Sequence, residues 1–158
     1  MHMIHLEKVA PAQRELLWNL NQKYLYEMTN FYDDPLDEAG VLHYGHFDDY
    51  FADPAREALL LCDDGALVGF AMLHPYSNFG GTVDRVLAEF TIFPMYRRRH
   101  LATQAAQAIF EGRPGRWEVK YNEKNAAAKA LWTRVTAKYA PQARRYSADE
   151  TVLCFTVD

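Results

Sequence analysis

The spacing of apolar residues changes several times along the chain, and each change marks the expected boundary of a helix or a strand. Short apolar or alternating runs predict β-strands at residues 4–9, 58–62, 66–74, 85–93, 116–121 and 151–157. Apolar residues at three- and four-residue intervals predict helices at residues 11–28, 100–111 and 125–139. Residues 29–54 lose this periodicity, apart from short helical turns expected near residues 47–52.

Turn-forming residues fall between these segments and indicate how they connect. Asp63-Asp64-Gly65 separates two strand-like runs, and Asp-Gly supplies the positive φ angles of a tight β-hairpin. Gly112 and Pro114 stop the helix that begins near His100. The predicted order is β-α-(α)-β-β-β-α-β-α-β, a mixed α/β (α+β) sheet. Because no repeat or linker interrupts the pattern, we expect one domain over residues 1–158.

Composition excludes several broad classes of protein. The chain has 158 residues, 49% of them hydrophobic, and a formal net charge of −4, which is not typical of a nucleic-acid binder. No apolar stretch approaches the ~20 residues of a membrane-spanning helix, and residues 1–5 lack the features of a secretory signal. Cys62 and Cys154 lie in strand-like runs, so buried thiols are expected, and His43 with His46 lacks a third metal ligand. We therefore expect a cytoplasmic protein with no metal, no membrane partner and no nucleic-acid partner.

The segment Phe93–Thr103 contains the most informative motif. A strand ends at Pro94, an arginine-rich turn follows at residues 97–99, and a helix starts at once. This arrangement directs unpaired backbone N–H groups and the positive end of a helix dipole to one point, which favours a bound diphosphate. The alternative is a solvated arginine cluster without a ligand.

This segment resembles the acetyl-CoA signature of the GNAT superfamily of N-acetyltransferases, Arg/Gln-x-x-Gly-x-Gly/Ala. Arg97 fills the first position and Ala102 the last, but His100 stands where the pattern has its first glycine. The His100 N–H remains available to phosphate if its backbone is helical, whereas its side chain would crowd or contact the cofactor. The resemblance implies cofactor contacts at Arg97, Arg98, Arg99, His100, Leu101, Ala102 and Thr103.

A second stretch is similar to the later GNAT block. Glu118-Val119-Lys120 precedes Asn125, Ala128, Leu131 and Trp132 in the order and spacing of the family. The resemblance implies that Asn125 and Ala128 seat the pantetheine arm and that Trp132 lies by the thioester. Asn125 also suits a helix N-cap and Trp132 a packed core, so both roles have structural alternatives. The GNAT resemblance covers roughly residues 58–139, and within it Tyr96–Arg99 and Pro114–Val119 look like a bacterial branch of predicted acetyltransferases.

The resemblance implies an enzyme that moves the acetyl group of acetyl-CoA to an amine. In the superfamily a strand N–H polarises the thioester carbonyl, and the matching amides here belong to Phe90 and Ile92, with Phe93 beside the pantetheine. A catalytically silent acyl-CoA-binding or regulatory module is the alternative. Turnover separates the two, because a silent module releases no CoA when an acceptor is added.

Two carboxylates are candidates for the base that deprotonates the amine. Glu118 matches a glutamate with this role in some relatives that acetylate protein N-termini, so we place it ahead of Glu89, which lies in an otherwise apolar strand. A structural hydrogen bond or salt bridge is the alternative for each. Trp132 replaces the usual acidic Tyr, so Tyr121, Tyr139 or water would protonate the leaving thiolate.

The segment from Thr29 to Ala55 combines acidic and aromatic residues and contains no Lys or Arg. In GNAT proteins the matching region walls the acceptor pocket, and such a composition would suit a cationic amine. The interpretation that we favour is a solvated acidic loop whose aromatic residues reach the core. The resemblance implies a small-molecule amine or a peptide N-terminus as the acceptor, which the sequence does not identify.

Overall fold

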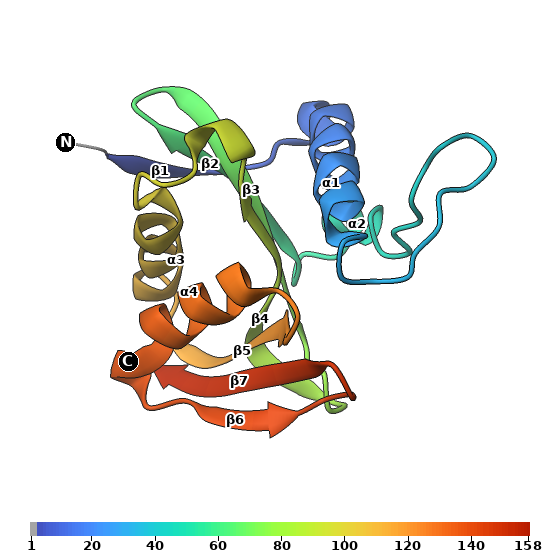
Figure 1. Ribbon diagram of the computed structural model, residues 1–158. Coiled ribbons are helices and arrows are strands. Elements are labelled where there is room, and N and C mark those ends of the chain that lie inside the picture. Colours follow the sequence, from blue (N-terminus) through green and yellow to red (C-terminus); the bar gives the residue numbers. More distant parts are fainter. Residues whose placement is uncertain (1–2) are drawn as a thin grey trace.

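A computed structural model of the chain describes residues 3–158, in which one seven-stranded sheet is flanked by helices (Figure 1). Residues 1 and 2, which the single-domain prediction includes, lie outside the described residues. The strands are β1 (Ile4–Lys8), β2 (Glu57–Asp63), β3 (Ala66–Tyr76), β4 (Thr82–Ile92), β5 (Gly115–Asn122), β6 (Gln142–Arg145) and β7 (Glu150–Val157). The α-helices are α1 (Arg14–Met28), α2 (Asp49–Ala52), α3 (Leu101–Glu111) and α4 (Ala126–Thr136). Short 3₁₀ turns occupy Pro11–Gln13, Pro94–Tyr96 and Ala137–Tyr139.

The strands follow the order β1-β2-β3-β4-β5-β7-β6, and the mixed α/β sheet predicted from the sequence is confirmed. The β2–β3 hairpin has its tight turn at Asp64 and Gly65, whose φ angles are 50° and 85°. β6 is absent from the predicted order. Its four residues, Gln-Ala-Arg-Arg, are all exposed at the sheet edge, so no buried face imposes an alternating pattern on them.

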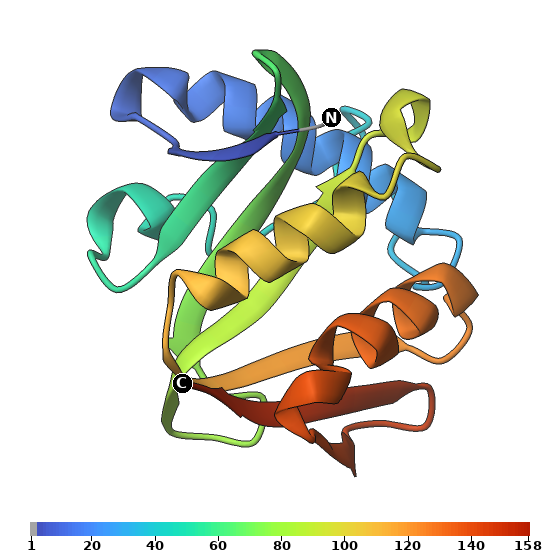
Figure 2. The same ribbon diagram turned by 90° about the vertical axis from the view of Figure 1, so that its left-hand side faces the viewer.

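The helices cover opposite faces of the sheet (Figures 1 and 2). α1 and α2 pack on one face, over a core that includes Leu17, Leu20 and Phe70. α3 and α4 pack on the other face, where Phe110 and Trp117 meet with ring centroids 4.9 Å apart. α1, α3 and α4 therefore bury the apolar residues that their sequences space at helical intervals.

β4 and β5 are neighbouring parallel strands that separate soon after they meet. Their pairing extends over three residues of β4, from Arg85 to Leu87, opposite Trp117 to Val119 of β5. Toward the C-terminal end of β4, residues 89–92 stay paired with β3 but have no partner in β5. The register between β3 and β4 also shifts opposite Ala88, where one residue of β4 is skipped. The sheet is therefore split at its centre.

Close packing of β3 against β4 depends on Gly69. A Cβ atom at this position would lie 2.1 Å from the carbonyl oxygen of Thr91, which is backbone and has little freedom to move. We expect Gly69→Ala to lower the free energy of unfolding by roughly 3 kcal/mol, measured by urea denaturation. Gly45→Ala is the matched control, because a Cβ atom there meets nothing within 4 Å. Equal stability of the two variants would contradict this account of the sheet.

Candidate active site

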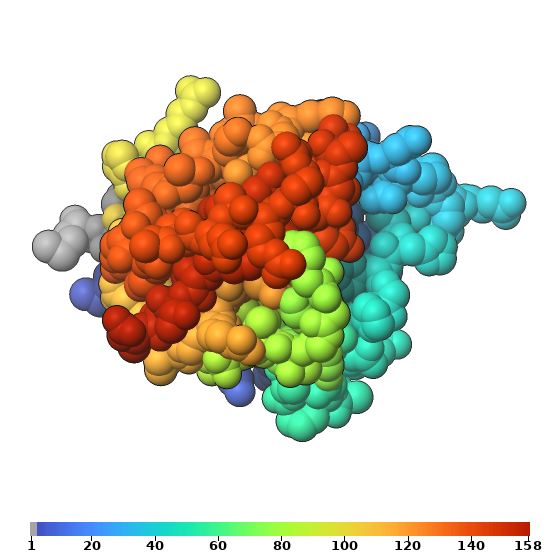
Figure 3. Space-filling view, turned by 90° about the horizontal axis from the view of Figure 1, so that it is seen from below, coloured from blue at the N-terminus to red at the C-terminus, as the bar shows by residue number. Residues whose placement is uncertain are grey.

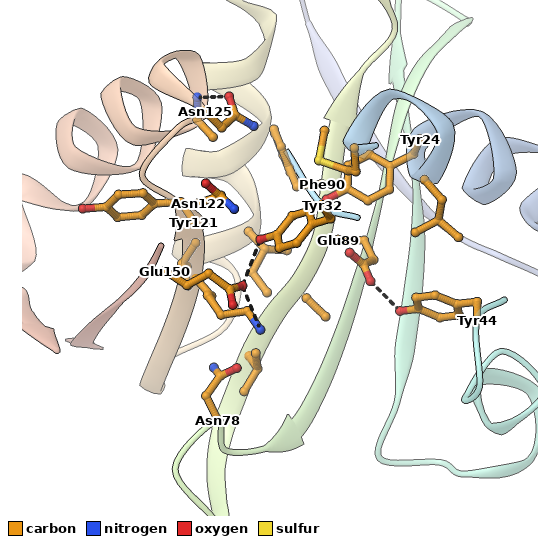
Figure 4. Close-up of a pocket in the computed structure, with 18 of the residues that line it drawn as sticks. Tyr24, Tyr32, Tyr44, Asn78, Glu89, Phe90, Tyr121, Asn122, Asn125 and Glu150 are labelled. Carbon is orange, nitrogen blue, oxygen red and sulfur yellow. Dashed lines mark hydrogen bonds and ion pairs between the residues drawn. The ribbon is translucent and has the colours of Figure 1, made fainter. Parts of the chain in front are cut away.

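A cavity of about 410 Å³ lies where β4 and β5 separate (Figure 4). Its walls come from the two strands, the C-terminal part of α1, the segment that follows α1, and α4 as far as Trp132, with further residues such as Arg56, His74 and Glu150. Among the site residues predicted from the sequence, the cavity is lined by Glu89, Phe90, Asn125, Ala128 and Trp132. Ile92, Phe93, Glu118 and the 97–103 segment lie outside this lining.

Glu89 is the carboxylate at the centre of the cavity. The hydroxyl of Tyr44 donates a hydrogen bond of 2.7 Å to its Oε2, and Tyr24 approaches from α1 (Figure 4). Burial raises the pKa of Glu89 to about 7, although hydrogen bonds from both tyrosines and the charge of Lys120 oppose this rise. A carboxyl group with a pKa near neutrality is suited to accept and release a proton.

Glu118 has a different environment. It is 4% exposed, and its carboxylate accepts hydrogen bonds from the hydroxyl of Ser77, the backbone N–H of Asn78 (2.9 Å) and the side-chain amide of Asn78 (2.8 Å). These bonds hold the β3–β4 turn, coloured green in Figure 3, against the orange and red C-terminal strands. These hydrogen bonds support the alternative in which Glu118 has a structural role.

The open edge of β4 directs backbone N–H groups toward the gap. The N–H of Phe93 donates to the carbonyl of Val68 on β3. Because successive amides of a strand point in opposite directions, those of Ile92 and Phe90 point away from β3. The carbonyl of Ile92, which points to the same side as its own N–H, also faces away from β3, since it accepts a bond of 2.7 Å from Nε of Arg97 outside the sheet. The Phe90 amide therefore faces the space that Glu89 borders.

The Arg97 side chain holds in place the turn at residues 97–100, which precedes α3. Its two terminal nitrogens donate to the Oε atoms of Glu27 on α1, both at 2.7 Å, and its Nε binds the carbonyl of Ile92. The arginine also lowers the pKa of Glu27. Arg97 therefore ties the turn to α1 and β4 with most of its donors.

After Arg97, the first N–H groups of α3 are left free of side-chain partners in the described chain, as an anion site requires, but the backbone of His100 is not right-handed helical as expected. His100 has a φ of 61° and a ψ of 13°, so it adopts a left-handed rather than a right-handed helical conformation, and Arg98 also has a positive φ of 64°. A glycine takes this conformation without cost, which explains why the family pattern has one there. No side chain among residues 3–158 caps α3, so its first N–H groups are free of a side-chain partner in that range.

Further along the same segment, Arg98, Arg99 and His100 are exposed, Leu101 is buried, and Ala102 and Thr103 are partly buried. The hydroxyl of Thr103 accepts a bond of 2.9 Å from Arg134 on α4.

α4 begins as the sequence predicted. The Oδ1 of Asn125 accepts a hydrogen bond of 3.1 Å from the N–H of Ala128, which confirms the N-cap. Trp132 is 5% exposed and packs edge-on against Phe90, with centroids 5.1 Å apart.

Of the two tyrosines named as substitute acids, Tyr121 lines the cavity and Tyr139 does not. Tyr139 stacks on Phe155 in the core, and the hydroxyl of Tyr121 points away from Glu89 (Figure 4).

Several residues of the cavity were not identified from the sequence. Tyr32 donates a bond of 2.9 Å to Glu150, whose carboxylate also lies 3.5 Å from the ammonium group of Lys120. Other lining residues that the sequence did not single out include Tyr24, Arg56, His74 and Asn122. The aromatic content of residues 29–54 was the one available signal, because it supplies Tyr32 and Tyr44.

Most acidic residues of the 29–55 segment do not reach the cavity. Asp34 alone among its aspartates and glutamate lines it. Asp48 pairs with Arg14, and Asp49 with His46. Asp37 accepts hydrogen bonds from the backbone of its own turn. These contacts favour the interpretation of the segment as a solvated acidic loop.

Within residues 3–158, no group of three His, Cys, Asp or Glu side chains is placed to hold a metal ion. In that same range, no helix combines the length and the hydropathy needed to cross a membrane.

The chain belongs to the acetyltransferase (GNAT) family, whose family model matches residues 15–137. No curated protein matches the sequence significantly. Among solved structures, the chain is similar to an acetyltransferase from Thermus thermophilus (19% identity, TM-score 0.67, 99% of each chain covered). It is also similar to a GNAT-family acetyltransferase from Streptococcus agalactiae (15% identity, TM-score 0.72, covering 98% of this chain and 96% of the other).

A third similar structure is the spermidine N-acetyltransferase from Vibrio cholerae in complex with CoA and spermine. It is 13% identical with a TM-score of 0.64, and the similarity covers 98% of this chain and 95% of the other. At these identities the likeness establishes the GNAT fold.

The raised pKa of Glu89 makes the free energy of unfolding depend on pH in a defined direction. Between the ordinary pKa of 4.5 and about 7, the unfolded chain releases a proton that the folded protein retains. The free energy of unfolding supplied by Glu89 therefore falls as pH rises through this window, by about 3 kcal/mol. We expect Glu89→Gln to gain stability relative to wild type over the same window, measured by urea denaturation at several pH values. A difference that does not change with pH would contradict the assigned pKa.

The left-handed backbone at His100 makes a second prediction. Glycine relieves a strain of about 1 kcal/mol, so His100→Gly should unfold at the same temperature as wild type or a higher one. It should also bind acetyl-CoA at least as well, judged from the rise in melting temperature. His100→Ala, which removes the ring but keeps Cβ, separates the two effects. A large loss of affinity in both variants would mean that the imidazole contacts the cofactor.

Proposed function

We propose that this protein is an N-acetyltransferase that moves the acetyl group of acetyl-CoA to an amine. The observation that carries the proposal is the position of Glu89, a carboxyl group with a pKa of about 7, in the cavity between the separated strands. Membership of the GNAT family supports it, as does the similar fold of the Vibrio cholerae protein in complex with CoA. The acceptor binds in the same cavity.

The residues around the gap fit acetyl-CoA. The uncapped start of α3, with the turn at residues 98–100, offers N–H groups and a positive dipole end to a diphosphate. Asn125 and Ala128 line the cavity at the start of α4, where the pantetheine arm would lie. When bound, acetyl-CoA supplies an acetyl group activated as a thioester. The amides of Phe90 and Ile92 are the donors for its carbonyl oxygen.

Glu89 is the better candidate for the base. An amine of pKa ~10.4 must lose a proton before it attacks, at a cost of about 4.6 kcal/mol at pH 7. With a pKa of about 7, Glu89 is close to half ionised at neutral pH and accepts that proton from within the cavity. Glu118 lies outside the cavity lining and its carboxylate is engaged by Ser77 and Asn78.

At the family position of the acid this chain has Trp132, whose indole N–H is too weak an acid to protonate the leaving thiolate and whose ring packs against Phe90. Holding the two reactants in one cavity supplies much of the acceleration without one. The same feature is the specific argument for the second candidate function, an acyl-CoA-binding module without turnover. Release of CoA that depends on an added amine decides between them.

The test of the proposed base is Glu89→Gln. We expect kcat/KM for CoA release with an accepted amine to fall on the order of a hundredfold, while acetyl-CoA still raises the melting temperature as in wild type. The wild-type rate should rise with pH through about 7 as Glu89 ionises, and the deficit of the variant should shrink at higher pH as the amine deprotonates unaided.

Glu118→Gln is the comparison. We expect it to lower the melting temperature, because the β3–β4 turn loses charged hydrogen bonds, with a smaller loss of kcat/KM at a temperature where it remains folded. Collapse of activity in folded Glu118→Gln, with near-normal turnover in Glu89→Gln, would assign the base to Glu118.

A further inference from the structure

One group of cavity residues remains without a role in acetyl transfer. Arg56 precedes β2 and His74 lies near the end of β3, and both line the cavity. The guanidinium of Arg56 lies between the rings of Tyr50 and Tyr76, 5.3 Å and 4.8 Å from their centroids. Its side chain is 9% exposed. A cation is thus held in a fixed, mostly buried position on the wall of the cavity.

The hydrogen-bonding capacity of Arg56 is not filled. Its Nε is buried and has no hydrogen-bond partner among residues 3–158. The nearest anion is Asp53, whose Oδ2 lies 3.6 Å away, beyond hydrogen-bond distance. Asp53 is engaged elsewhere, because it accepts bonds from the hydroxyl of Tyr76 (2.6 Å) and the N–H of Ala55 (2.9 Å). Arg56 is thus balanced by one carboxylate at ion-pair distance without a hydrogen bond to it, and a buried guanidinium in that state favours a further acceptor oxygen.

His74 adds a second donor. Its Nδ1 accepts a hydrogen bond of 3.1 Å from the backbone N–H of Tyr76, so Nδ1 carries no proton. Burial and the nearby charge of Arg56 lower the pKa of His74 to about 4, so the ring is neutral at pH 7. Its proton therefore resides on Nε2, which donates rather than accepts. Arg56 and His74 together offer N–H groups of the kind that bind carboxylate or phosphate oxygens.

These donors lie on the same face of the sheet as Glu89. Met72 pairs with Glu89, and His74 follows Met72 by two residues, so their side chains share a face. With a rise of about 3.3 Å per residue and a strand spacing of about 4.8 Å, the Cα atoms of Glu89 and His74 are about 8 Å apart. An amine beside Glu89 and an anionic group beside His74 therefore fit in one small molecule.

The other charged residues of the cavity do not compete for this role. The ammonium group of Lys120 lies 3.5 Å from Glu150 and 4.4 Å from the ring centroid of Tyr146, and its side chain is 33% exposed, against 9% for Arg56, so water screens its charge more strongly. Glu150 also accepts bonds from Tyr32 and Ser147. Asp34 is exposed on the solvent side of the lining. Within the described chain, Arg56 is the charged lining group whose donor is left unfilled.

We propose that the acceptor is a small amine that also carries an anionic group, a carboxylate or a phosphate, and that Arg56 and His74 bind this group while the amine lies beside Glu89. This inference rests on the proposed acetyltransferase function and identifies the class of acceptor. It differs from the cationic acceptor that the acidic composition of residues 29–55 would suit.

The test compares matched acceptors in an assay of CoA release. The probes are ω-amino carboxylates of three to six carbons, the alkylamines and α,ω-diamines of the same lengths, and 3-aminopropyl phosphate. We expect kcat/KM for the best anionic amine to exceed that of its alkylamine about tenfold or more, with the diamine poorest. The carboxylate and phosphate arms show which anion the subsite prefers.

Variants connect this preference to the residues. Arg56→Gln should remove the preference for the anionic amine through KM, with the alkylamine unaffected, and His74→Ala should reduce it. Arg56→Lys keeps the charge and should retain part of it. Arg14→Gln is the matched control, since Arg14 also lies over a ring (Phe47, 5.2 Å) and pairs with an aspartate, outside this cavity. A preference that survives Arg56→Gln, or diamines as the best acceptors, would overturn the inference while leaving the acetyltransferase function intact.

Binding separates failure of the inference from failure of the proposed function. If acetyl-CoA binds but no amine is acetylated, the proposed function fails. Calorimetric titration of 4-aminobutanoate and 3-aminopropyl phosphate into wild type and Arg56→Gln then decides the inference independently. Binding that is lost in Arg56→Gln and kept in Arg14→Gln supports the anion subsite. The absence of binding to folded wild-type protein overturns it.

Discussion

Two parallel strands in the middle of a sheet normally share hydrogen bonds along their whole length, but β4 and β5 share them over three residues of each strand. Beyond Leu87, β4 keeps its partner on one side and leaves its other edge open, so the Phe90 amide points into a gap instead of toward a carbonyl. The skipped residue at Ala88 coincides with this separation. The cavity, the free amides and the position of Glu89 all follow from the split, because a continuous sheet would fill the same space with β5.

Three polar side chains within two turns of α1 organise the rest of the site. Gln22 holds both backbone groups of Leu42, with bonds of 2.6 Å and 2.9 Å, and so brings Tyr44 over the sheet. Tyr24 approaches Glu89 directly, and Glu27 binds Arg97 in the turn that precedes α3. One helix thereby fixes the segment at Leu42, the surroundings of the Glu89 carboxyl group and the turn at Arg97 relative to one another. The same packing removes water from Glu89, which is why its pKa rises.

The sequence predicted those features that a local pattern encodes. The hairpin at Asp64-Gly65, the helix cap at Asn125 and the packed strands each follow from a few neighbouring residues. β6 was not predicted, because an exposed edge strand has no buried face and so no alternation of apolar and polar residues. The contact of Tyr44 with Glu89 joins positions 45 residues apart, and no spacing rule predicts it. Motif similarity placed Glu118 ahead of Glu89, yet strand direction and the β3–β4 turn decide which carboxyl group faces the cavity, and these are properties of the folded chain.

The acidic composition of residues 29–55 does not determine the charge of the cavity that this segment borders. The 29–55 segment is acidic, but its aspartates satisfy donors of the surrounding chain: Asp48 pairs with Arg14 and Asp53 accepts from Tyr76 and Ala55. A charge that finds a partner on the surface contributes little to the potential within the cavity. Arg56 lies just beyond the acidic segment, is buried against two aromatic rings, and has a donor without a partner in residues 3–158. For the proposed anion subsite, this one arginine counts for more than several solvated aspartates, because desolvation strengthens the field of a fixed charge.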